Sequence, residues 1–230
     1  MCCYLRRVPA ASLIERGRAS LRERGVLGAL KHVARRVRDR LYWHETFIWY
    51  ELPLGAPGVG DRKLPEGLEL VRATEQDLAL AGQTGKQPGQ VVEMLSAGHD
   101  LWLVREGDRA AFSCWIYRSS APQIDAHGGW FDLPRGIVCL EDSVTNSDFR
   151  GKGVAPAAWS QLALMLAEEG LAMVTRVRDD NAPSRKACLK AGFEEIGAMD
   201  FQRVLRRRRQ RMEPGRGELG RRLAATLDGG

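Results

Sequence analysis

The most constraining feature of the sequence is a glycine-containing turn between a predicted strand over residues 137–145 and a predicted helix over residues 153–169. Residues 146–155 read Asn-Ser-Asp-Phe-Arg-Gly-Lys-Gly-Val-Ala. Glycines let backbone N–H groups approach an anion closely, and a helix N-terminus adds unpaired N–H groups and partial positive charge. The turn therefore predicts a pyrophosphate site. It does not match the dinucleotide pattern, because Pro156 stands at the third glycine, and it contains no Gly-Lys-Ser/Thr.

Predicted strands and helices alternate on both sides of this turn, which favours a mixed α/β class. The predicted strands lie at 68–73, 101–105, 110–117, 137–145, 171–177 and 197–205, with a further strand at 45–52. The predicted helices lie at 74–81, 88–97, 153–169 and 182–191, and residues 118–135 form a long loop. An additional amphipathic helix is expected at 12–41, where apolar residues recur every three or four positions.

A second motif follows the turn at residues 181–193, which read Asn-Ala-Pro-Ser-Arg-Lys-Ala-Cys-Leu-Lys-Ala-Gly-Phe. Arg150-x-x-Gly153-x-Ala155 resembles the R/Q-x-x-G-x-G/A signature of the GCN5-related N-acetyltransferases (GNAT), and the second motif resembles the N-x-x-A/S … K-x-G-F ending of that family. The resemblance covers roughly residues 66–205. It implies an α/β fold (an α+β mixed sheet) that is GNAT-like, binds acyl-CoA, and splays at the strand before the turn.

The resemblance also implies an enzyme that uses acetyl-CoA as co-substrate, held in the splay. It assigns coenzyme contacts to Ser143, Val144, Thr145, Arg150, Gly151, Lys152, Gly153, Val154, Ala155, Asn181 and Ser184. Asn181 also stands where a helix N-cap is expected, and one side chain can serve both purposes.

Transfer of an acetyl group to an amine needs a group that removes the proton of the amine, for which a carboxylate is suited. Glu141 and Asp142 are adjacent acids in the strand that leads to the turn. That strand is similar to the corresponding strand of spermidine/spermine acetyltransferases, where the acid aligned with Glu141 is the proposed base. Glu141 is therefore the first candidate, directly or through water. Asp142 is the second, as base or counter-ion; the alternative is that one of these acids pairs with a nearby arginine.

One position departs from the family pattern. Many members have a tyrosine four residues before the glycine of the Gly-Phe pair, where it protonates the departing thiolate, and Cys188 occupies this position here. Three possibilities stay open: Cys188 donates the proton, water donates it, or the thiolate leaves unaided. Cys188 is otherwise interpreted as a small buried apolar residue.

The acceptor is expected to be a primary amine on a small molecule, because residues 45–205 carry a net charge of −7, which suits a cation. An amino sugar and a peptide N-terminus are left open. The short helices and the 118–135 loop are expected to wall its pocket, and the aromatic cluster at 42–50 is a further candidate to cover it. In the loop the candidate contacts are Asp125, His127, Trp130, Phe131 and Asp132.

The two ends of the chain are basic: residues 1–44 carry a net charge of +8 and residues 206–230 carry +5. The predicted organisation is a basic helical extension with an aromatic segment and linker at 1–60, the catalytic domain at 61–205, and a disordered Arg-rich tail at 206–230. Contact with an anionic surface through these ends is one hypothesis. The alternative function is a nucleic-acid- or membrane-associated binding protein with a degenerate acyltransferase domain.

Five cysteines without regular spacing, Cys2, Cys3, Cys114, Cys139 and Cys188, argue against a disulfide framework and favour a reducing cytoplasm. No metal-ligand motif and no apolar run of transmembrane length occur in the sequence. We therefore expect a cytoplasmic enzyme with no metal and no integral membrane segment. Peripheral association with a membrane and a homodimer are left open.

Overall fold

The computed structural model describes residues 42–56, 58–122, 129–205, 207–215 and 217–227. The chain divides into two compact units. The smaller comprises Met1–His44 and Phe201–Arg209, and the larger comprises Glu45–Asp200 and Gln210–Gly230. The helix predicted at 12–41 lies outside the described residues. The larger unit holds the candidate site.

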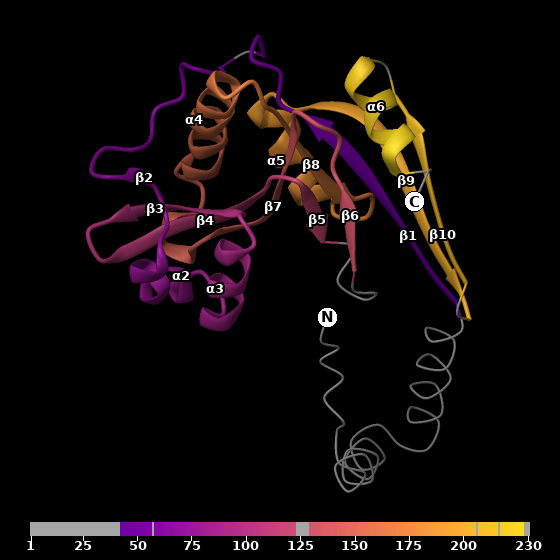
Figure 1. Cartoon of the computed structure of the whole chain (residues 1–230). Coiled ribbons are helices and arrows are strands. Elements are labelled where there is room, and N and C mark those ends of the chain that lie inside the picture. The colour runs from indigo at the N-terminus through magenta and orange to yellow at the C-terminus, as the bar shows by residue number, and fades with distance from the viewer. Residues whose placement is uncertain (1–41, 57, 123–128, 206, 216, 228–230) are drawn as a thin grey trace, which may run out of the picture. The chain divides into compact units, whose positions relative to one another are not determined.

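The described residues include an eight-stranded mixed sheet with the order β10-β9-β1-β8-β7-β4-β3-β2 (Figure 1), of which β2, β3, β4, β7 and β8 belong wholly to the larger unit. The strands are β1 (Tyr42–Glu51), β2 (Glu69–Arg72), β3 (Asp100–Glu106), β4 (Arg109–Tyr117), β7 (Ile137–Thr145), β8 (Ala172–Arg178), β9 (Glu194–Val204) and β10 (Arg207–Pro214). The pairs β2·β3, β3·β4, β4·β7 and β1·β8 are antiparallel. β7 and β8 are parallel, and the chain crosses between them through a helix, as parallel strands require.

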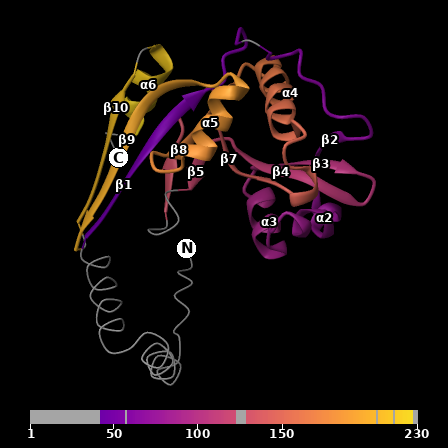
Figure 2. The same cartoon turned by 180° about the vertical axis from the view of Figure 1, so that it is seen from behind.

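Helices cover both faces of this sheet (Figures 1 and 2). α4 (Val154–Glu168) and α5 (Ala182–Ala191) pack on one face, and α2 (Leu78–Gln83) and α3 (Pro88–Ser96) lie on the other. Two short 3-10 turns, η1 (Glu75–Asp77) and η2 (Ser147–Phe149), precede α2 and α4. A capping box between Thr74 and Asp77 begins η1.

The main apolar core lies between the sheet and α4. Leu162 and Leu166 of α4 pack with Tyr50 of β1, Phe112 of β4 and Val138 of β7, and all five are buried. Trp159 extends this core toward α5 through an edge-to-face contact with Phe193, at 5.6 Å between ring centroids. Burial of these large side chains supplies the main force that fixes α4 against the strands.

The predicted strands and helices from residue 45 to residue 205 are confirmed with shifts of a few residues at their ends. The region predicted as a loop at 118–135 differs, because it contains β5 (Ser120–Pro122) and β6 (Trp130–Asp132), which pair as a separate two-stranded sheet. Phe131 packs edge-on against Trp49 at 5.8 Å, which holds this ribbon near β1. Asp125 and His127 lie outside the described residues.

The C-terminal segment corrects the prediction of a disordered tail at 206–230. Residues 207–214 form β10, and Glu218–Leu227 form helix α6. The side chains of Met212, Leu223 and Ala224 are buried, and Gly215 donates a hydrogen bond to the Ile196 carbonyl at 2.8 Å. Gly220 lies so close to β9 that a Cβ atom there would stand 2.1 Å from the Ile196 oxygen. The prediction of disorder rested on the many arginines of this segment. The structure shows that its apolar residues lie on one face, which packs on the sheet.

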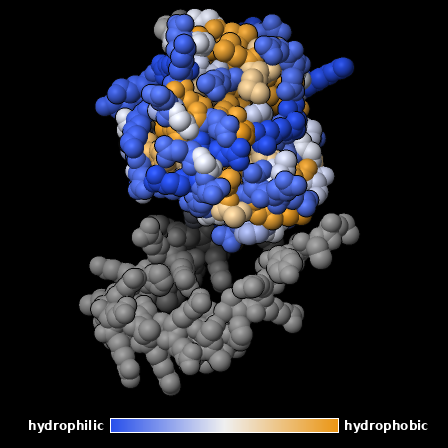
Figure 3. All heavy atoms as spheres, turned by 90° about the vertical axis from the view of Figure 1, so that its left-hand side faces the viewer, coloured by the Kyte–Doolittle hydropathy of each residue, from blue (hydrophilic) through white to orange (hydrophobic). Residues whose placement is uncertain are grey.

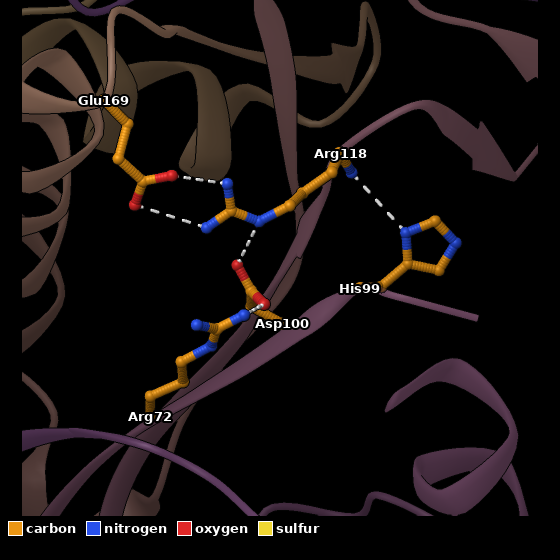
Figure 4. A network of polar contacts seen from close by, with 5 residues as sticks. All are labelled: Arg72, His99, Asp100, Arg118 and Glu169. Atoms are coloured by element: carbon orange, nitrogen blue, oxygen red, sulfur yellow. Dashed lines mark hydrogen bonds and ion pairs between the residues drawn. The ribbon is translucent and has the colours of Figure 1, made fainter. Parts of the chain in front are cut away.

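A network of buried charge joins β3 and β4 to the end of α4 (Figure 4). The Asp100 carboxylate, only 1% exposed, pairs with Arg72 and accepts a bond from Arg118 Nε at 2.6 Å. Arg118 also pairs with Glu169, which follows α4, at 2.6 Å. Desolvation lowers the pKa of neighbouring His99, whose Nδ1 faces the Arg118 backbone N–H at 3.5 Å. A buried carboxylate needs such partners, because an unpaired charge is costly there.

The β2 edge of the sheet is short and carries charged residues, including Glu69, which pairs with Arg105 of β3 at 2.7 Å. In Figure 3, which shows this side, hydrophilic residues interrupt the hydrophobic areas. Short, charged edge strands are a common protection against pairing with other chains.

The charge network generates a stability prediction. Arg118→Met removes the less exposed of the two arginine partners of Asp100 and the link to Glu169, so we expect the free energy of unfolding to fall by about 3 kcal/mol. Arg105→Met removes an exposed ion pair of the same type and is expected to cost less than about 1 kcal/mol. Urea unfolding of the two variants and the wild type measures both effects. Equal losses in the two variants would contradict the structural importance of the Asp100 network.

Candidate functional site

β7 and β8 separate partway along their length, and this separation creates the site. They pair only where Ile137–Leu140 faces Ala172–Thr175. β7 then continues to Thr145 and β8 to Arg178 without further pairing between the two strands in the described structure. The sheet therefore opens at the carboxyl ends of two parallel strands, as the sequence predicts.

A β-bulge in β7 marks the point of separation. Trp115 of β4 faces Glu141 and Ser113 faces Val144, so two residues of β7 stand opposite Cys114 alone. One of these two, Asp142, has a φ of 50°, in the left-handed region that a non-glycine residue seldom adopts. A bulge of this kind leaves local backbone groups unpaired and bends the strand away from its neighbour.

A buried lysine holds the bulge in place. Lys86, between α2 and α3, donates from Nζ to the Asp142 carbonyl at 2.6 Å and forms an ion pair with the Asp142 carboxylate. The Lys86 side chain is 3% exposed. Since burial of an ammonium group is costly unless it is paired, this double contact fixes the left-handed residue.

A cleft of about 410 Å³ occupies the space between the separated strands. Its walls come from β7, β8, α4 and α5. Eight of the predicted site residues line it: Glu141, Asp142, Ser143, Thr145, Ala155, Asn181, Ser184 and Cys188. A second cavity of about 300 Å³ shares Thr145, Ala155 and Ala187 with the first and adds Arg150, Gly151, Gly153, Val154 and Lys190. The shared residues show that the two cavities adjoin each other.

The far end of this site is suited to a pyrophosphate. Gly151 and Gly153 both have a φ of 76°, and a Cβ atom on either would meet no heavy atom within 4 Å. Gly153 is the N-cap of the 15-residue helix α4, and no side chain caps that end of the helix. The open space beside unpaired helix N–H groups therefore fits an anion. Arg150 and Lys190 line the cavity and add positive charge.

The other residues predicted to contact the coenzyme lie close to these two cavities. Lys152 stands in the same turn, with Nζ 5.2 Å from the centre of the Phe149 ring. Val144 pairs with β4 at the rim of the bulge and does not line either cavity. Asn181 caps α5, because its side chain accepts a hydrogen bond from the Ser184 N–H at 3.3 Å. The structure therefore confirms the capping role of Asn181 and places it at the cleft as well.

Both candidate acids are ion-paired. Glu141 Oε1 lies 2.6 Å from Nε of Arg176, and Asp142 pairs with Lys86. The sequence analysis left open an ion pair between one of these acids and an arginine. In the structure Glu141 pairs with an arginine and Asp142 pairs with a lysine. Burial raises the pKa of nearby Tyr117, and the charges of Glu141 and Asp142 add to that shift. The inner end of the cleft thus holds two carboxylates and two cations.

Cys188 faces the cleft from α5 and is 5% exposed. Burial raises the pKa of its thiol to about 11. An ordinary thiol has a pKa of about 8.5. Proton transfer from Cys188 to such a thiolate would therefore be unfavourable, which weakens the hypothesis that Cys188 is the acid. The structure favours the interpretation of Cys188 as a buried apolar residue.

Sequence reasoning missed three residues at this site. Lys86 gave no local signal, because its partner lies 56 positions away. Arg176 did give one: it is the single charge in the apolar run Met173-Val174-Thr175-Arg176-Val177. Trp159 donates from Nε1 to Ser143 Oγ at 3.3 Å, a contact between α4 and the bulge that the sequence did not indicate.

Comparison with solved structures shows that the chain has the fold of GNAT-family acetyltransferases. An acetyltransferase of that family from Colwellia psychrerythraea matches with a TM-score of 0.50 at 14% identity, over 84% of this chain and 73% of that one. A GNAT-family protein from Novosphingobium aromaticivorans matches with a TM-score of 0.47 at 16% identity, over 69% of this chain and 63% of that one, less than two thirds of its length. No protein-family model and no curated protein matches the sequence. At 14% identity, the match to the Colwellia psychrerythraea protein establishes the fold alone.

The described part of the chain contains no helix long and apolar enough to cross a bilayer. Within the same residues no group of three or more His, Cys, Asp or Glu side chains could hold a metal ion. The described cysteines, Cys114, Cys139 and Cys188, are unpaired and buried.

The raised pKa of Cys188 generates a second prediction. Iodoacetamide should modify Cys188 slowly at pH 7.5, and the rate should keep rising through pH 10, because the thiolate fraction increases up to about pH 11. Peptide mass spectrometry separates this labelling from that of the other cysteines. A rate that levels off near pH 8.5 would show that the thiol is ordinary, and would return Cys188 to consideration as an acid.

Proposed function

We propose that this chain is an acetyl-CoA-dependent N-acetyltransferase that transfers an acetyl group to a primary amine by direct attack. The observation that carries the proposal is the pair of adjoining cavities, one beside the β7 bulge and the other at the glycine turn before α4. An elongated ligand with a pyrophosphate in its middle and a reactive thioester at one end matches this arrangement. The GNAT-like fold supports the same conclusion.

Different residues along the cleft would bind the pyrophosphate and the pantetheine arm of the coenzyme. Backbone N–H groups of Gly151, Gly153 and Ala155 would hold the pyrophosphate, helped by the charges of Arg150 and Lys152. Backbone groups from Ser143 to Thr145 would pair with the pantetheine arm from the β7 side, and Asn181 and Ser184 would contact it from α5. Val154 would add the next helix N–H group.

The reaction follows from the same arrangement. Acetyl-CoA supplies a thioester, which a neutral amine attacks at the carbonyl carbon, so that a C–N bond forms and the C–S bond breaks. Glu141 would accept a proton from the amine, directly or through water. Unpaired backbone N–H groups of the bulge would stabilise the negative charge that develops on the carbonyl oxygen. Asp142 is the second candidate base, and its pairing with Lys86 also gives it a structural role.

The departing thiolate would take its proton from solvent or from the proton released by the amine. Cys188 is less suited to this task, because its pKa of about 11 exceeds that of an ordinary thiol. The cytoplasmic location, the domain boundaries, the contact of the basic ends with an anionic surface and a homodimer stay predictions. No described contact favours the alternative of a binding protein with a degenerate acyltransferase domain.

Coenzyme binding tests the proposal directly. Gly153→Val places a branched side chain in the open space at the N-terminus of α4, so we expect acetyl-CoA to bind at least about tenfold more weakly. Gly170→Val is the matched control. It has nearly the same backbone, with φ 73° against 76°, and equally open surroundings, but lies just beyond the other end of α4. Isothermal calorimetry with acetyl-CoA measures both variants, and equal effects, or no binding by the wild type, would contradict the proposal.

A pair of isosteric substitutions identifies the base. Glu141→Gln keeps the shape of the side chain but cannot accept the proton, so we expect kcat to fall by about 10²–10⁴ with little change in acetyl-CoA affinity. Asp142→Asn should have a smaller effect on kcat. Release of free thiol, followed with a chromogenic disulfide, measures the rate. The opposite order of the two losses would assign the role to Asp142.

A further inference from the structure

Four side chains form a row across one face of the sheet beside the cleft. Trp49 of β1 and Arg176 of β8 are direct cross-strand partners, and so are Trp115 of β4 and Glu141 of β7. The ion pair between Arg176 and Glu141 joins the two pairs. Successive side chains of a strand point to opposite faces. The neighbours of these residues in sequence belong to the core against α4, so the row lies on the opposite face.

This row holds more hydrogen-bond donors than the described protein atoms satisfy. Nη1 of Arg176 and the Nε1 atoms of Trp49 and Trp115 are buried and have no hydrogen-bond partner among the described residues. Leaving a buried donor unpaired costs about 1–3 kcal/mol, and more when the group is charged. Of these three residues, Arg176 is the one that lines the cleft, so its Nη1 is the donor that an acceptor oxygen of a ligand can satisfy.

The guanidinium of Arg176 is fixed in place. Its side chain is 4% exposed and lines the cleft. Nε bonds Glu141, and Nη2 donates to the carbonyl of Pro122 in β5. The rings of Phe47, Trp49 and Phe131 lie 5.0–5.5 Å from its central carbon. With two of its nitrogens engaged and three rings around it, Arg176 presents Nη1 as a preset donor for an anion.

The charges at the inner end of the cleft are already balanced. Glu141 is matched by Arg176, and Asp142 is matched by Lys86. A simple cationic amine would leave an unbalanced positive charge there once it bound. A zwitterion would not, since its ammonium group can face a carboxylate while its own carboxylate faces Arg176.

We propose that the acceptor is a zwitterionic α-amino acid with an apolar or aromatic side chain, an inference that rests on the proposed function. Its carboxylate binds Nη1 of Arg176 and its amino group faces Glu141. Both contacts involve one Arg–Glu pair, so the two charged groups of the ligand must lie close together, as they do across a single Cα atom. Phe112, Leu140 and Val177 supply apolar lining in the same cleft.

The test uses acceptors that differ only in the carboxylate. Wild-type protein with acetyl-CoA is assayed with phenylalanine and phenethylamine, tryptophan and tryptamine, and leucine and isoamylamine. We expect kcat/KM for at least one amino acid to exceed that of its decarboxylated partner by about tenfold or more. The partner lacks the carboxylate and therefore cannot form the charge-assisted hydrogen bond to Arg176. Arg176→Gln also removes the ion-pair partner of Glu141, so activity on both members of a pair can fall. The expected result is that the preference, which is the ratio of the two kcat/KM values, falls to within about threefold.

Controls separate the possible failures. Arg105→Gln removes an exposed strand arginine and should keep the wild-type preference. Acetyl-CoA calorimetry shows whether Arg176→Gln is folded; if it is not, Arg176→Lys takes its place and is expected to lose most of the preference. Wild-type protein that does not bind acetyl-CoA would overturn the proposed function. Protein that binds acetyl-CoA but acetylates no amino acid, or acetylates the decarboxylated amines equally well, would overturn the amino-acid inference alone.

Discussion

The loss of pairing between β7 and β8 beyond Leu140 and Thr175 is the constraint on which the rest of the site depends. Two parallel strands that stayed paired to their ends would close the cleft, and the glycine turn would then face only solvent. The bulge at Asp142 is the local cause, because one extra residue against β4 redirects the end of β7. The strain of a left-handed aspartate is offset by the buried contacts of Lys86. The site therefore depends on a lysine that lies between α2 and α3, on the face of the sheet opposite α4.

The net charge of the predicted catalytic region differs from the local charge at the site. The net charge of −7 over residues 45–205 suggests a centre that attracts cations. At the end of the cleft beside the bulge, however, Glu141 and Asp142 each have a buried cation next to them. Electrostatic interactions between buried groups are screened far less than those across the surface, so the local balance decides what can bind. This is why the acceptor inferred from Arg176 is zwitterionic, whereas composition alone favours a simple amine.

The sequence predicts the parts of the structure that are encoded locally. The glycine turn, the cap at Asn181 and the alternation of strands and helices each depend on residues that are close in sequence, and the structure places them as expected. Pairs that depend on the tertiary fold, such as Lys86 with Asp142, could not be found this way. The C-terminal helix was not predicted for a different reason. Its packing depends on the close contact between Gly220 and Ile196, which composition does not indicate.

Cys188 shows how burial can change the chemistry of a position that the family pattern assigns to an acid. A thiol could in principle replace a phenol, since both can donate a proton. Burial makes the thiol the weaker acid of the two, because it raises the pKa of Cys188 to about 11, above the value of about 10 for an ordinary phenol. The overall reaction does not require such a donor. An amine that enters as an ammonium ion releases protons as it becomes an amide, and one of them suffices for the departing thiolate. A chain with Glu141 at the splay and no acid on α5 can therefore complete the transfer with the proton that its own acceptor supplies.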